Sequence, residues 1–437
     1  MKNISFFDRL MILANGGVFI MRKNFLTGLL TGIGSALFIF VLLVAALFYF
    51  SDKTEADSSD AKEISNNQEV EEPSAEVNYN KIMKKLEFLE KLVDTNYLES
   101  VDNVSFEDGI YKGFISSLED PYSTYFTKEE YSALMESSSG IYCGIGATVS
   151  QDVKTGIITI VKPFKNSPAI KAGLLPGDII IKVDGEEVTG KDLSEVVGHM
   201  KGIEGTTVEL SIGREGEKEP LKFTITRQEI EVPTIEYQML DNSIGYIIIT
   251  QFDEVTVTQF NKAVDALEKQ KMKALIVDVR NNPGGLLDSV VNVLDRLLPP
   301  ELIVYTMDKN NVRKEESATD DKTVKVPMAV LINGNSASAA EIFAGTLQDY
   351  KTATIVGTTS FGKGIVQQVI PLSDGTAVKL TISKYYTPNG RNIHGTGITP
   401  DVSIELNDEL AKEVTIPIDK DNQLQKAIKL MKSKIKK

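Results

Sequence analysis

The sequence contains very little cysteine and histidine, and this scarcity limits the chemistry open to it. Cys143 is the only cysteine among 437 residues. The chain therefore cannot form an internal disulfide, and a zinc site built from several cysteines is excluded. Only two histidines are present, His199 and His394, and the metalloprotease pattern HExxH is absent. A Ser-His-Asp triad would have to use one of these two histidines.

An excess of positive charge is also missing. The formal net charge is -14, with 42% apolar and 25% charged residues, an ordinary composition for a globular protein. The basic run is the tail Lys426–Lys437, which we interpret as the solvated end of a last helix. A nucleic-acid partner is not expected, because a duplex binder needs a basic footprint. At roughly 100–200 residues per domain, the length allows two or three domains plus tails.

A long run without charge extends from Phe25 to Phe50. It exceeds the roughly 20 residues that a helix needs to cross a bilayer. Arg22 and Lys23 precede it, and nine acidic residues and two lysines follow over residues 51–76. The positive-inside rule then predicts residues 1–24 in the cytoplasm and the rest of the chain outside. A cleaved signal peptide would have a shorter apolar region ending in small residues, and a buried core helix is a third alternative.

These features predict a single-pass transmembrane helix in a bacterial cytoplasmic membrane. The following residues, 51–77, are polar, acidic and poor in aromatic residues. We interpret them as a disordered linker, because such a composition cannot bury enough apolar surface to fold.

Residues 78–135 are predicted to form an N-terminal helical region. Apolar residues recur at spacings of four, three and four along residues 79–97: Ile82, Leu86, Leu89 and Val93. This spacing forms one face of an amphipathic helix. A second helical stretch covers residues 106–118, and a turn follows at residues 120–123. The apolar face is expected to pack on its own chain or on a second subunit.

Residues 136–228 change to short β runs and glycine turns, and they resemble a PDZ domain. The resemblance is carried by Ser167-Pro168-Ala169, Ala172-Gly173-Leu174, Pro176-Gly177-Asp178-Ile179-Ile180 and Val183-Asp184-Gly185. It implies that the loop Gly144-Ile145-Gly146-Ala147 binds the terminal carboxylate of a peptide. Successive backbone N–H groups form an anion nest, and the next strand accepts the peptide as an added strand. Taken alone, the two glycines favour a plain turn.

Strands and helices alternate over residues 229–411, which predicts an α/β core. Ser338 follows a predicted strand and opens a helix, and with Glu341 it fits the S-x-x-E capping box. A hydroxyl at a helix N-terminus also faces free N–H groups that favour developing negative charge. Lys363 lies between two glycines beside apolar residues, where desolvation would lower its pKa and make it a base. Gln367 is close enough in sequence to hydrogen-bond the amine or the hydroxyl.

Six motifs in one order make residues 79–404 resemble the carboxyl-terminal processing peptidases, also called tail-specific proteases. The motifs are Asp120-Pro121-Tyr122-Ser123-Thr124-Tyr125-Phe126, the PDZ stretch, Asp278-Val279-Arg280-Asn281-Asn282-Pro283-Gly284-Gly285, Ser336-Ala337-Ser338-Ala339-Ala340-Glu341, Phe361-Gly362-Lys363-Gly364 with Gln367, and Pro388-Asn389-Gly390-Arg391. The resemblance implies a multidomain α/β protein. Its peptidase core would be of the ββα-repeat, ClpP/crotonase-like type, with an inserted PDZ domain and a C-terminal helical tail, 412–437.

The same resemblance implies a catalytic site of five residues: Ser338 as the nucleophile, Lys363 as the base, Gln367 to orient the lysine, and the backbone N–H groups of Gly284 and Ala339 as the oxyanion hole. It implies no metal and no cofactor. Ser336 is the fallback nucleophile. His199 is expected in the ligand groove or on the surface, and His394 receives no catalytic role.

Together these features predict a membrane-anchored serine endopeptidase that recognises the C-termini of protein substrates through its PDZ domain. Peptide bonds would be hydrolysed through a Ser-Lys acyl-enzyme mechanism. Two alternatives stay open, a non-catalytic PDZ receptor for protein tails and a different hydrolase on the same core. A homodimer through residues 79–118 and 422–435 is implied by the resemblance only.

Overall fold

A computed structural model describes residues 9–14, 17–22, 77–99, 101, 103–319, 323–410 and 416–435. The chain divides into two compact units, Met1–Asn96 and Tyr97–Lys437. The predicted transmembrane helix, Phe25–Phe50, lies outside the described residues. Within the described ranges, no helix combines the length and the apolar character that crossing a membrane requires.

The described part of the first unit holds one hairpin and one helix. β1 (Arg9–Ala14) pairs antiparallel with β2 (Gly17–Arg22). α2 spans Tyr79–Asn96 and confirms the helix predicted over residues 79–97. None of its side chains is buried within the described chain, so its apolar face has no covering there.

The second unit begins with a helical segment that contains one helix more than the sequence predicts. It consists of α3 (Asn103–Ser116), the short strand β3 (Thr124–Phe126) and α4 (Lys128–Ser139). The Thr127 hydroxyl caps α4, and Gly140 ends it in the left-handed conformation. The predicted domain boundary between residues 135 and 136 therefore falls inside α4.

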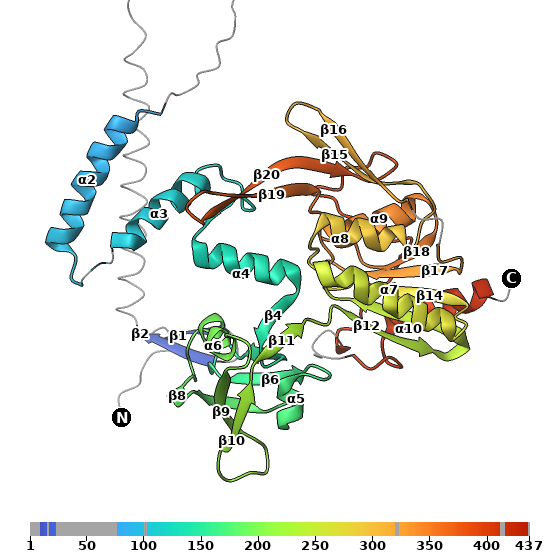
Figure 1. The fold of residues 1–437 in the computed structure, drawn as a ribbon, viewed down its shortest axis with the longest axis horizontal. Helices are drawn as coiled ribbons and strands as arrows, with labels where there is room; N and C mark the ends of the chain where they lie inside the picture. The colour runs from blue at the N-terminus through green and yellow to red at the C-terminus, as the bar shows by residue number, and fades with distance from the viewer. Residues whose placement is uncertain are drawn as a thin grey trace, which may run out of the picture. The chain divides into compact units, whose positions relative to one another are not determined.

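A five-stranded path of antiparallel strands and two helices forms the region that resembles a PDZ domain (Figure 1). The strand order is β10-β9-β7-β6-β5, so β5 lies at an edge. The elements are β5 (Ala147–Gln151), β6 (Ile158–Pro163), α5 (Pro168–Ala172), β7 (Ile179–Val183), β8 (Glu186–Glu187), α6 (Leu193–Met200), β9 (Thr207–Gly213) and β10 (Leu221–Thr226). Alternate residues of β6 and β9, such as Ile158 and Ile160, are fully buried, as expected for strands with one covered face.

Two short strands flank this region. β4 (Ile141–Gly144) and β11 (Gln228–Glu231) pair antiparallel, so the chain enters and leaves the region side by side. This pairing lets the region be inserted between the helical segment and the α/β core.

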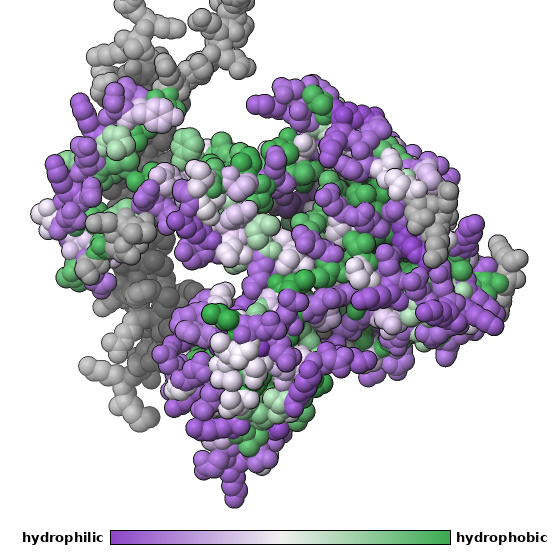
Figure 2. Space-filling model, viewed as in Figure 1, coloured by the Kyte–Doolittle hydropathy of each residue, from purple (hydrophilic) through white to green (hydrophobic). Residues whose placement is uncertain are grey.

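The core is built on a six-stranded sheet with the order β12-β13-β14-β17-β18-β21. Its strands are β12 (Ile235–Leu240), β13 (Ile244–Ile249), β14 (Ala274–Asp278), β17 (Met328–Ile332), β18 (Ala353–Gly357) and β21 (Val402–Ser403), with the 3-10 turn η2 (Asp241–Ser243) between the first two. The strands from β13 to β21 run parallel. Every residue of β14 and β17 is buried, as parallel sheets with two covered faces require. Polar side chains lie at the protein surface, and Figure 2 shows hydrophilic residues over most of the visible face.

Helices cover both faces of this sheet. Leu275 and Val277 pack with α7 (Glu254–Lys269), α8 (Leu287–Asp295) and α9 (Ala339–Asp349). The intervening side chains of β14 pack with α10 (Asn422–Ile435) on the other face. The predicted C-terminal tail is therefore a layer of the core, and only its outer side is the solvated helix that the basic run predicts.

A second sheet carries the strands that follow the predicted lysine loop. Its order is β16-β15-β20-β19, and β3 of the helical segment pairs with β20. The strands are β15 (Leu302–Asp308), β16 (Arg313–Ser317), β19 (Ile365–Pro371) and β20 (Ala377–Tyr386). The pairing of β3 brings the Asp120–Phe126 motif next to the strands that surround Lys363.

Candidate active site

Ser338 lies in the turn between β17 and α9. Its φ is 54° and its ψ is -116°, a positive-φ conformation that residues with a side chain rarely adopt. Ala339 is the first residue of α9, and Ser338 is its N-cap, in the predicted capping box with Glu341, whose carboxylate accepts from the Ser338 N–H at 2.9 Å. Strained backbone persists only where the surrounding contacts enforce it. Here it places the Ser338 hydroxyl at the N-terminus of α9.

The loop after β14 meets the Ser338 turn because β14 and β17 are parallel neighbours whose carboxyl ends lie at one edge. The Ala337 N–H donates to the Asn282 carbonyl oxygen at 2.9 Å. Gly284 has φ +107°, and a Cβ at this position would lie 2.7 Å from Ser338 Cβ and 3.0 Å from the Ala339 nitrogen. Glycine is required here, because no side chain fits.

The structure thus brings together three of the five predicted site residues: Gly284, Ser338 and Ala339. One of the two predicted oxyanion donors is already engaged, because the Gly284 N–H donates to Asn282 Oδ1 at 2.8 Å. A substrate oxyanion would have to compete with this side chain for the N–H.

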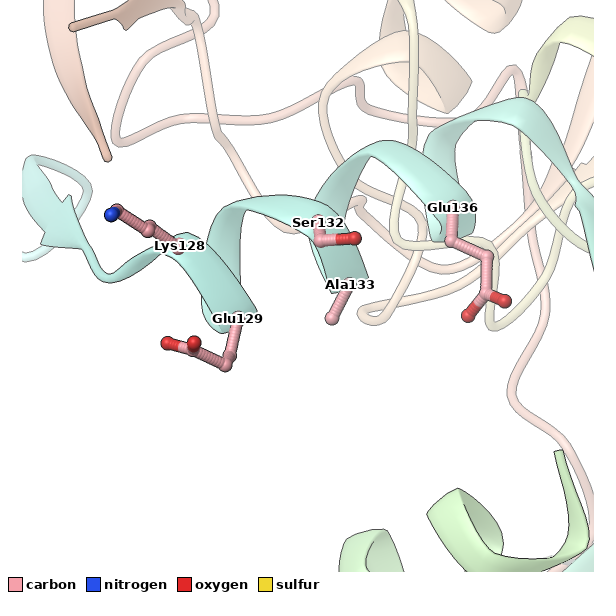
Figure 3. A pocket seen from close by; sticks show the side chains of 5 residues that line it. All are labelled: Lys128, Glu129, Ser132, Ala133 and Glu136. Carbon is pink, nitrogen blue, oxygen red and sulfur yellow. The ribbon is translucent and has the colours of Figure 1, made fainter. Parts of the chain in front are cut away.

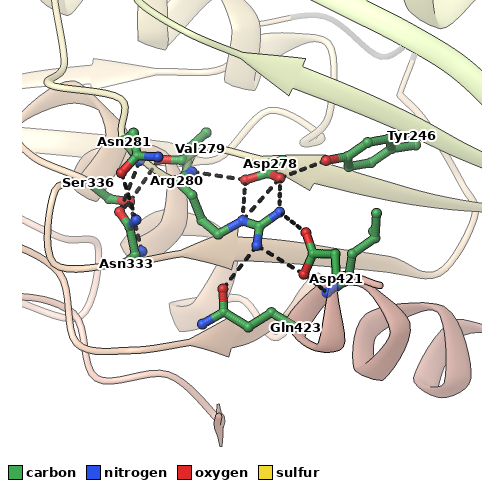
Figure 4. A network of polar contacts seen from close by, with 10 residues as sticks. Tyr246, Asp278, Val279, Arg280, Asn281, Asn333, Ser336, Asp421 and Gln423 are labelled. Carbon is green, nitrogen blue, oxygen red and sulfur yellow. Dashed lines mark hydrogen bonds and ion pairs between the residues drawn. The ribbon is translucent and has the colours of Figure 1, made fainter. Parts of the chain in front are cut away.

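A buried ion network holds the start of this loop against α10 (Figure 4). Arg280 donates to Asp278 Oδ2 at 2.6 Å, to Asp421 Oδ2 at 2.7 Å and to Gln423 Oε1 at 2.9 Å. The Tyr246 hydroxyl donates to Asp278 Oδ2 at 2.7 Å. Burial opposes the guanidinium charge, but Asp278 and Asp421 outweigh it and raise the pKa of Arg280. The network ties the C-terminal helix to the strand that leads into the Gly284 loop.

Lys363 is half-buried in the loop between β18 and β19. Burial, followed by the nearby charge of Lys379, lowers its pKa, while Asp120 and Glu341 act in the opposite direction. The lowered pKa has the direction that a general base needs. Its Nζ lies 4.5 Å from the centroid of the Tyr122 ring. Among the described residues, no hydrogen bond joins this amine to the Ser338 hydroxyl.

Glu341 connects the serine turn to the lysine loop. Its carboxylate is fully buried and accepts four hydrogen bonds. Oε2 accepts from the Ser338 N–H at 2.9 Å and the Lys363 N–H at 2.8 Å. Oε1 accepts from the Ser360 hydroxyl at 2.6 Å and the Gly362 N–H at 2.7 Å. One carboxylate therefore fixes the backbone of both predicted catalytic residues.

A second connection between the same two residues comes from β20. The Tyr385 hydroxyl donates to the Lys363 carbonyl oxygen at 2.6 Å and lies 3.1 Å from the Ser338 carbonyl oxygen. The side chain is 1% exposed, and burial raises its pKa, so it stays a neutral donor. Sequence reasoning missed this tyrosine, because it comes from a strand with no catalytic motif.

The other predicted site residues have different surroundings. Gln367 donates to Thr381 Oγ1 at 3.4 Å, and no hydrogen bond joins it to Lys363 within the described chain. Ser336 is fully buried, and its hydroxyl donates to the Val279 carbonyl oxygen at 2.7 Å. That bond gives the fallback serine a structural role.

The two histidines lie outside the cluster formed by Gly284, Ser338, Ala339, Glu341 and Lys363. The His199 side chain is 54% exposed on α6, and its Nε2 lies 3.9 Å from a Glu195 oxygen. His394 is exposed in the loop that crosses closely over Gly364. No hydrogen bond joins either histidine to Ser338 among the described residues, and their lack of a catalytic role stays a prediction.

The predicted carboxylate loop, Gly144-Ile145-Gly146-Ala147, joins β4 to the edge strand β5. Ile145 is buried, and its carbonyl oxygen accepts from the Ala169 N–H at 2.8 Å. The Tyr142 ring lies against Gly144, where a Cβ would meet it at 2.9 Å. Burial raises the pKa of Tyr142 to about 12, although the Gly146 and Ala147 N–H groups act against this. These two N–H groups therefore face the hydroxyl of a tyrosine of the same chain.

Two hollows in the described part of the protein are lined by neither Ser338 nor Lys363. One of about 490 Å³ follows one side of α4 (Figure 3), lined by Lys128, Glu129, Ser132, Ala133 and Glu136. The other, of about 520 Å³, is lined by Glu254, Val257, Leu286, Leu287, Asp288, Ser289 and Asn292. The second hollow begins directly after the Gly284 loop and is the nearer of the two in sequence to the cluster.

Comparison with known families gives three matches along the chain. Peptidase family S41 matches residues 243–404, and the PDZ domain matches residues 142–225. The N-terminal domain of the activating protease CtpB matches residues 41–130.

Individual proteins are similar over most of the chain. The carboxy-terminal processing protease CtpB of Bacillus subtilis is 40% identical over 332 residues, which is 75% of this chain and 69% of that protein. A carboxy-terminal-processing protease of Bartonella bacilliformis is 40% identical over 319 residues, 72% of this chain and 73% of that protein. A solved structure from Bacteroides fragilis, described as an S41 protease, shares the fold at a TM-score of 0.52 and 17% identity, covering 77% of this chain and 91% of that one.

Proposed function

Because this chain belongs to peptidase family S41, as a carboxy-terminal processing serine protease with a PDZ domain, we propose that Ser338 and Lys363 are its catalytic pair. Both residues lie at the edge where the loops after the parallel strands meet. Loops at the carboxyl ends of parallel strands are the usual position of active sites in such sheets.

The proposed reaction proceeds through an acyl-enzyme. The neutral amine of Lys363 takes the proton of the Ser338 hydroxyl while the serine oxygen bonds to the scissile carbonyl carbon. The resulting ammonium gives this proton to the leaving nitrogen as the peptide bond breaks. A water molecule then attacks the ester and passes a proton to the lysine, which gives it to the Ser338 oxygen as the ester bond breaks.

The observation that carries this proposal is the shared carboxylate. Glu341 Oε2 accepts from the backbone N–H groups of Ser338 and Lys363 at 2.9 and 2.8 Å. Two N–H groups that share one oxygen hold their residues close together. The lowered pKa of Lys363 supports the role of base, because a lysine must lose its proton before it can accept one.

The proposed oxyanion hole consists of the backbone N–H groups of Ala339 and Gly284. The Ala339 N–H lies in the first turn of α9, where free N–H groups favour negative charge. The Gly284 N–H is held by Asn282 at 2.8 Å and would have to exchange this partner for the oxyanion.

We further propose that the PDZ domain binds the C-terminal end of a protein substrate. Gly146 and Ala147 would supply adjacent N–H groups for a carboxylate that displaces the Tyr142 hydroxyl, and β5 is an edge strand to which an extended peptide can add. For the membrane, we propose that Phe25–Phe50 anchors the chain, with the catalytic part on the extracytoplasmic side. A protease-protection assay that found the PDZ region in the cytoplasm would contradict this orientation.

The homodimer stays a prediction. The α2 face offers exposed apolar side chains, among them Ile82 and Leu89 at 43% and 44% exposure. The apolar side of α10 is covered by its own sheet, so the predicted contact through this helix would have to use its outer side. Sedimentation of the full-length chain measures the oligomeric state, and a monomer would contradict the prediction.

The test of the catalytic pair compares Ser338→Ala, Lys363→Ala and Ser336→Ala. The substrate is a quenched fluorescent peptide with a free apolar C-terminus. The first two variants are expected to lose turnover by at least about 10³-fold while still binding the peptide. Ser336→Ala removes a structural hydroxyl of the same loop and should lose stability but keep turnover. Full turnover in Ser338→Ala, or loss only in Ser336→Ala, would reject the assignment.

A further inference from the structure

The Lys363 amine lies against an aromatic ring from the helical segment. Its Nζ is 4.5 Å from the centroid of Tyr122, within the distance of about 6 Å at which a cation is attracted to a ring face. The ring attracts the charged ammonium and gives no comparable stabilisation to the neutral amine. Tyr122 therefore distinguishes the two protonation states of the predicted base.

The turn that carries this ring is held by its own hydrogen bonds. The Tyr122 N–H donates to Asp120 Oδ1 at 3.1 Å, and the Ser123 hydroxyl donates to Asp120 Oδ2 at 2.5 Å. The Thr381 N–H of β20 in turn donates to Ser123 Oγ at 3.0 Å. The turn is thereby fixed to the sheet beside the lysine loop, so the ring keeps its place when the lysine moves.

The charged groups around Lys363 come from three elements. Lys379 on β20 disfavours the ammonium, as does burial, while Asp120 of the turn and Glu341 of α9 favour it. The ring of Tyr122 also favours the ammonium. The balance among these groups decides how much of the lysine is neutral at a given pH.

We propose that Tyr122 is a positioning residue for the catalytic lysine: its ring holds Lys363 as an ammonium in the resting enzyme and again after the lysine has taken the serine proton. This inference rests on the proposed catalytic pair. The base becomes active when the amine loses its proton to solvent and with it the attraction to the ring. It can then turn to the Ser338 hydroxyl.

The experiment compares Tyr122→Leu with Tyr122→Phe in the full-length chain, measuring kcat/KM from pH 5 to 10 with the quenched peptide. Phenylalanine keeps the ring face and leucine removes it. Losing the ring increases the neutral fraction of the lysine at low pH and weakens the base at high pH. The ratio of kcat/KM, Leu over Phe, should therefore fall by about threefold to tenfold from the acid limb to the alkaline plateau.

A purely structural tyrosine would give a ratio that is constant with pH, and that result overturns the proposal. Tyr111→Leu is the matched control, because this ring of the same segment packs at a tilt against Tyr125, with the ring centroids 5.2 Å apart, and has no ring contact with the lysine among the described residues. Its ratio to wild type should not vary with pH. If Tyr122→Leu does not fold, Tyr122→Met removes the ring with a side chain of similar volume that adapts more easily to the gap.

The two hypotheses fail in different ways. Turnover that survives in Ser338→Ala and Lys363→Ala rejects the catalytic pair itself. If those variants are inactive and the Leu-to-Phe ratio at position 122 is flat, only the role of Tyr122 is rejected.

Discussion

Replacing Glu341 by glutamine should reduce both catalysis and stability, because its buried carboxylate accepts from the backbones of both predicted catalytic residues. Each carboxylate oxygen accepts two hydrogen bonds, from the Ser360 hydroxyl and Gly362 N–H on one side and from the Ser338 and Lys363 N–H groups on the other. In either orientation, the new amide NH2 would face at least one N–H donor. Leaving one or two buried N–H groups without an acceptor costs about 1–3 kcal/mol each.

We expect Glu341→Gln to lower the free energy of unfolding by about 2–4 kcal/mol. The rate should fall as well, because the bonds that are lost run either to the N–H groups of Ser338 and Lys363 or to the N–H of Gly362, which directly precedes Lys363. A displacement of about 1 Å between catalytic groups costs about 10²-fold in rate. The variant should therefore show kcat reduced by about 10²-fold with KM nearly unchanged, measured on the quenched peptide alongside urea unfolding.

Glu130→Gln is the matched control. Glu130 also accepts a backbone N–H at a helix start, from Thr127 at 2.9 Å, but it lies on α4 and is exposed. Its replacement should cost at most about 1 kcal/mol in stability and leave kcat unchanged. The reasoning is refuted if Glu341→Gln turns over at the wild-type rate, or if both variants lose kcat to the same extent.

Two further predictions concern backbone fit and pH. Gly284→Ala should reduce kcat by at least about 10²-fold, because the new Cβ would lie 2.7 Å from Ser338 Cβ. Gly177→Ala is the control: Gly177 has φ +89° and no atom near the position of a Cβ, so urea unfolding should show only a backbone strain of about 1–3 kcal/mol. Burial raises the pKa of Asp253 from 3.8 to about 6, so the folded protein binds more protons than the unfolded one between these values and loses stability as the pH rises through them. Urea unfolding should therefore show Asp253→Asn gaining up to about 3 kcal/mol over wild type between pH 4 and pH 7, and an equal difference at both pH values would refute it.

Regular elements of the core could be predicted from the sequence because their signals are local. The predicted alternation of strands and helices is present in the core, and α9 begins directly after Ser338, the residue predicted to open it. Buried apolar runs between turn residues identify such strands whatever packs on them. The α4 helix shows the limit of this reasoning, because its signal is a capping box at Thr127 without a buried apolar face.

The contacts of the candidate site could be predicted only in part. The motifs predict Ser338, Ala339 and Gly284 as site residues, and the structure brings these three together. The spacing of Glu341 from Ser338 predicts a helix cap, but no local pattern predicts that its carboxylate also accepts from the Lys363 N–H. The contact between the Tyr122 ring and the Lys363 amine also joins distant parts of the sequence, because it depends on the pairing of β3 with β20.

The site therefore has two parts with different sensitivities. The central sheet is buried on both faces, so the Ser338 turn rests on many apolar contacts that a single polar change does not remove. The Lys363 loop depends on a few specific partners: the Glu341 carboxylate, the Tyr385 hydroxyl and the Tyr122 ring. Losing one partner, at about 1–3 kcal/mol, shifts the population of the active loop conformation by roughly five- to 150-fold. Because the sheet is unaffected, variants at these partners should lose proteolysis while their unfolding stays cooperative.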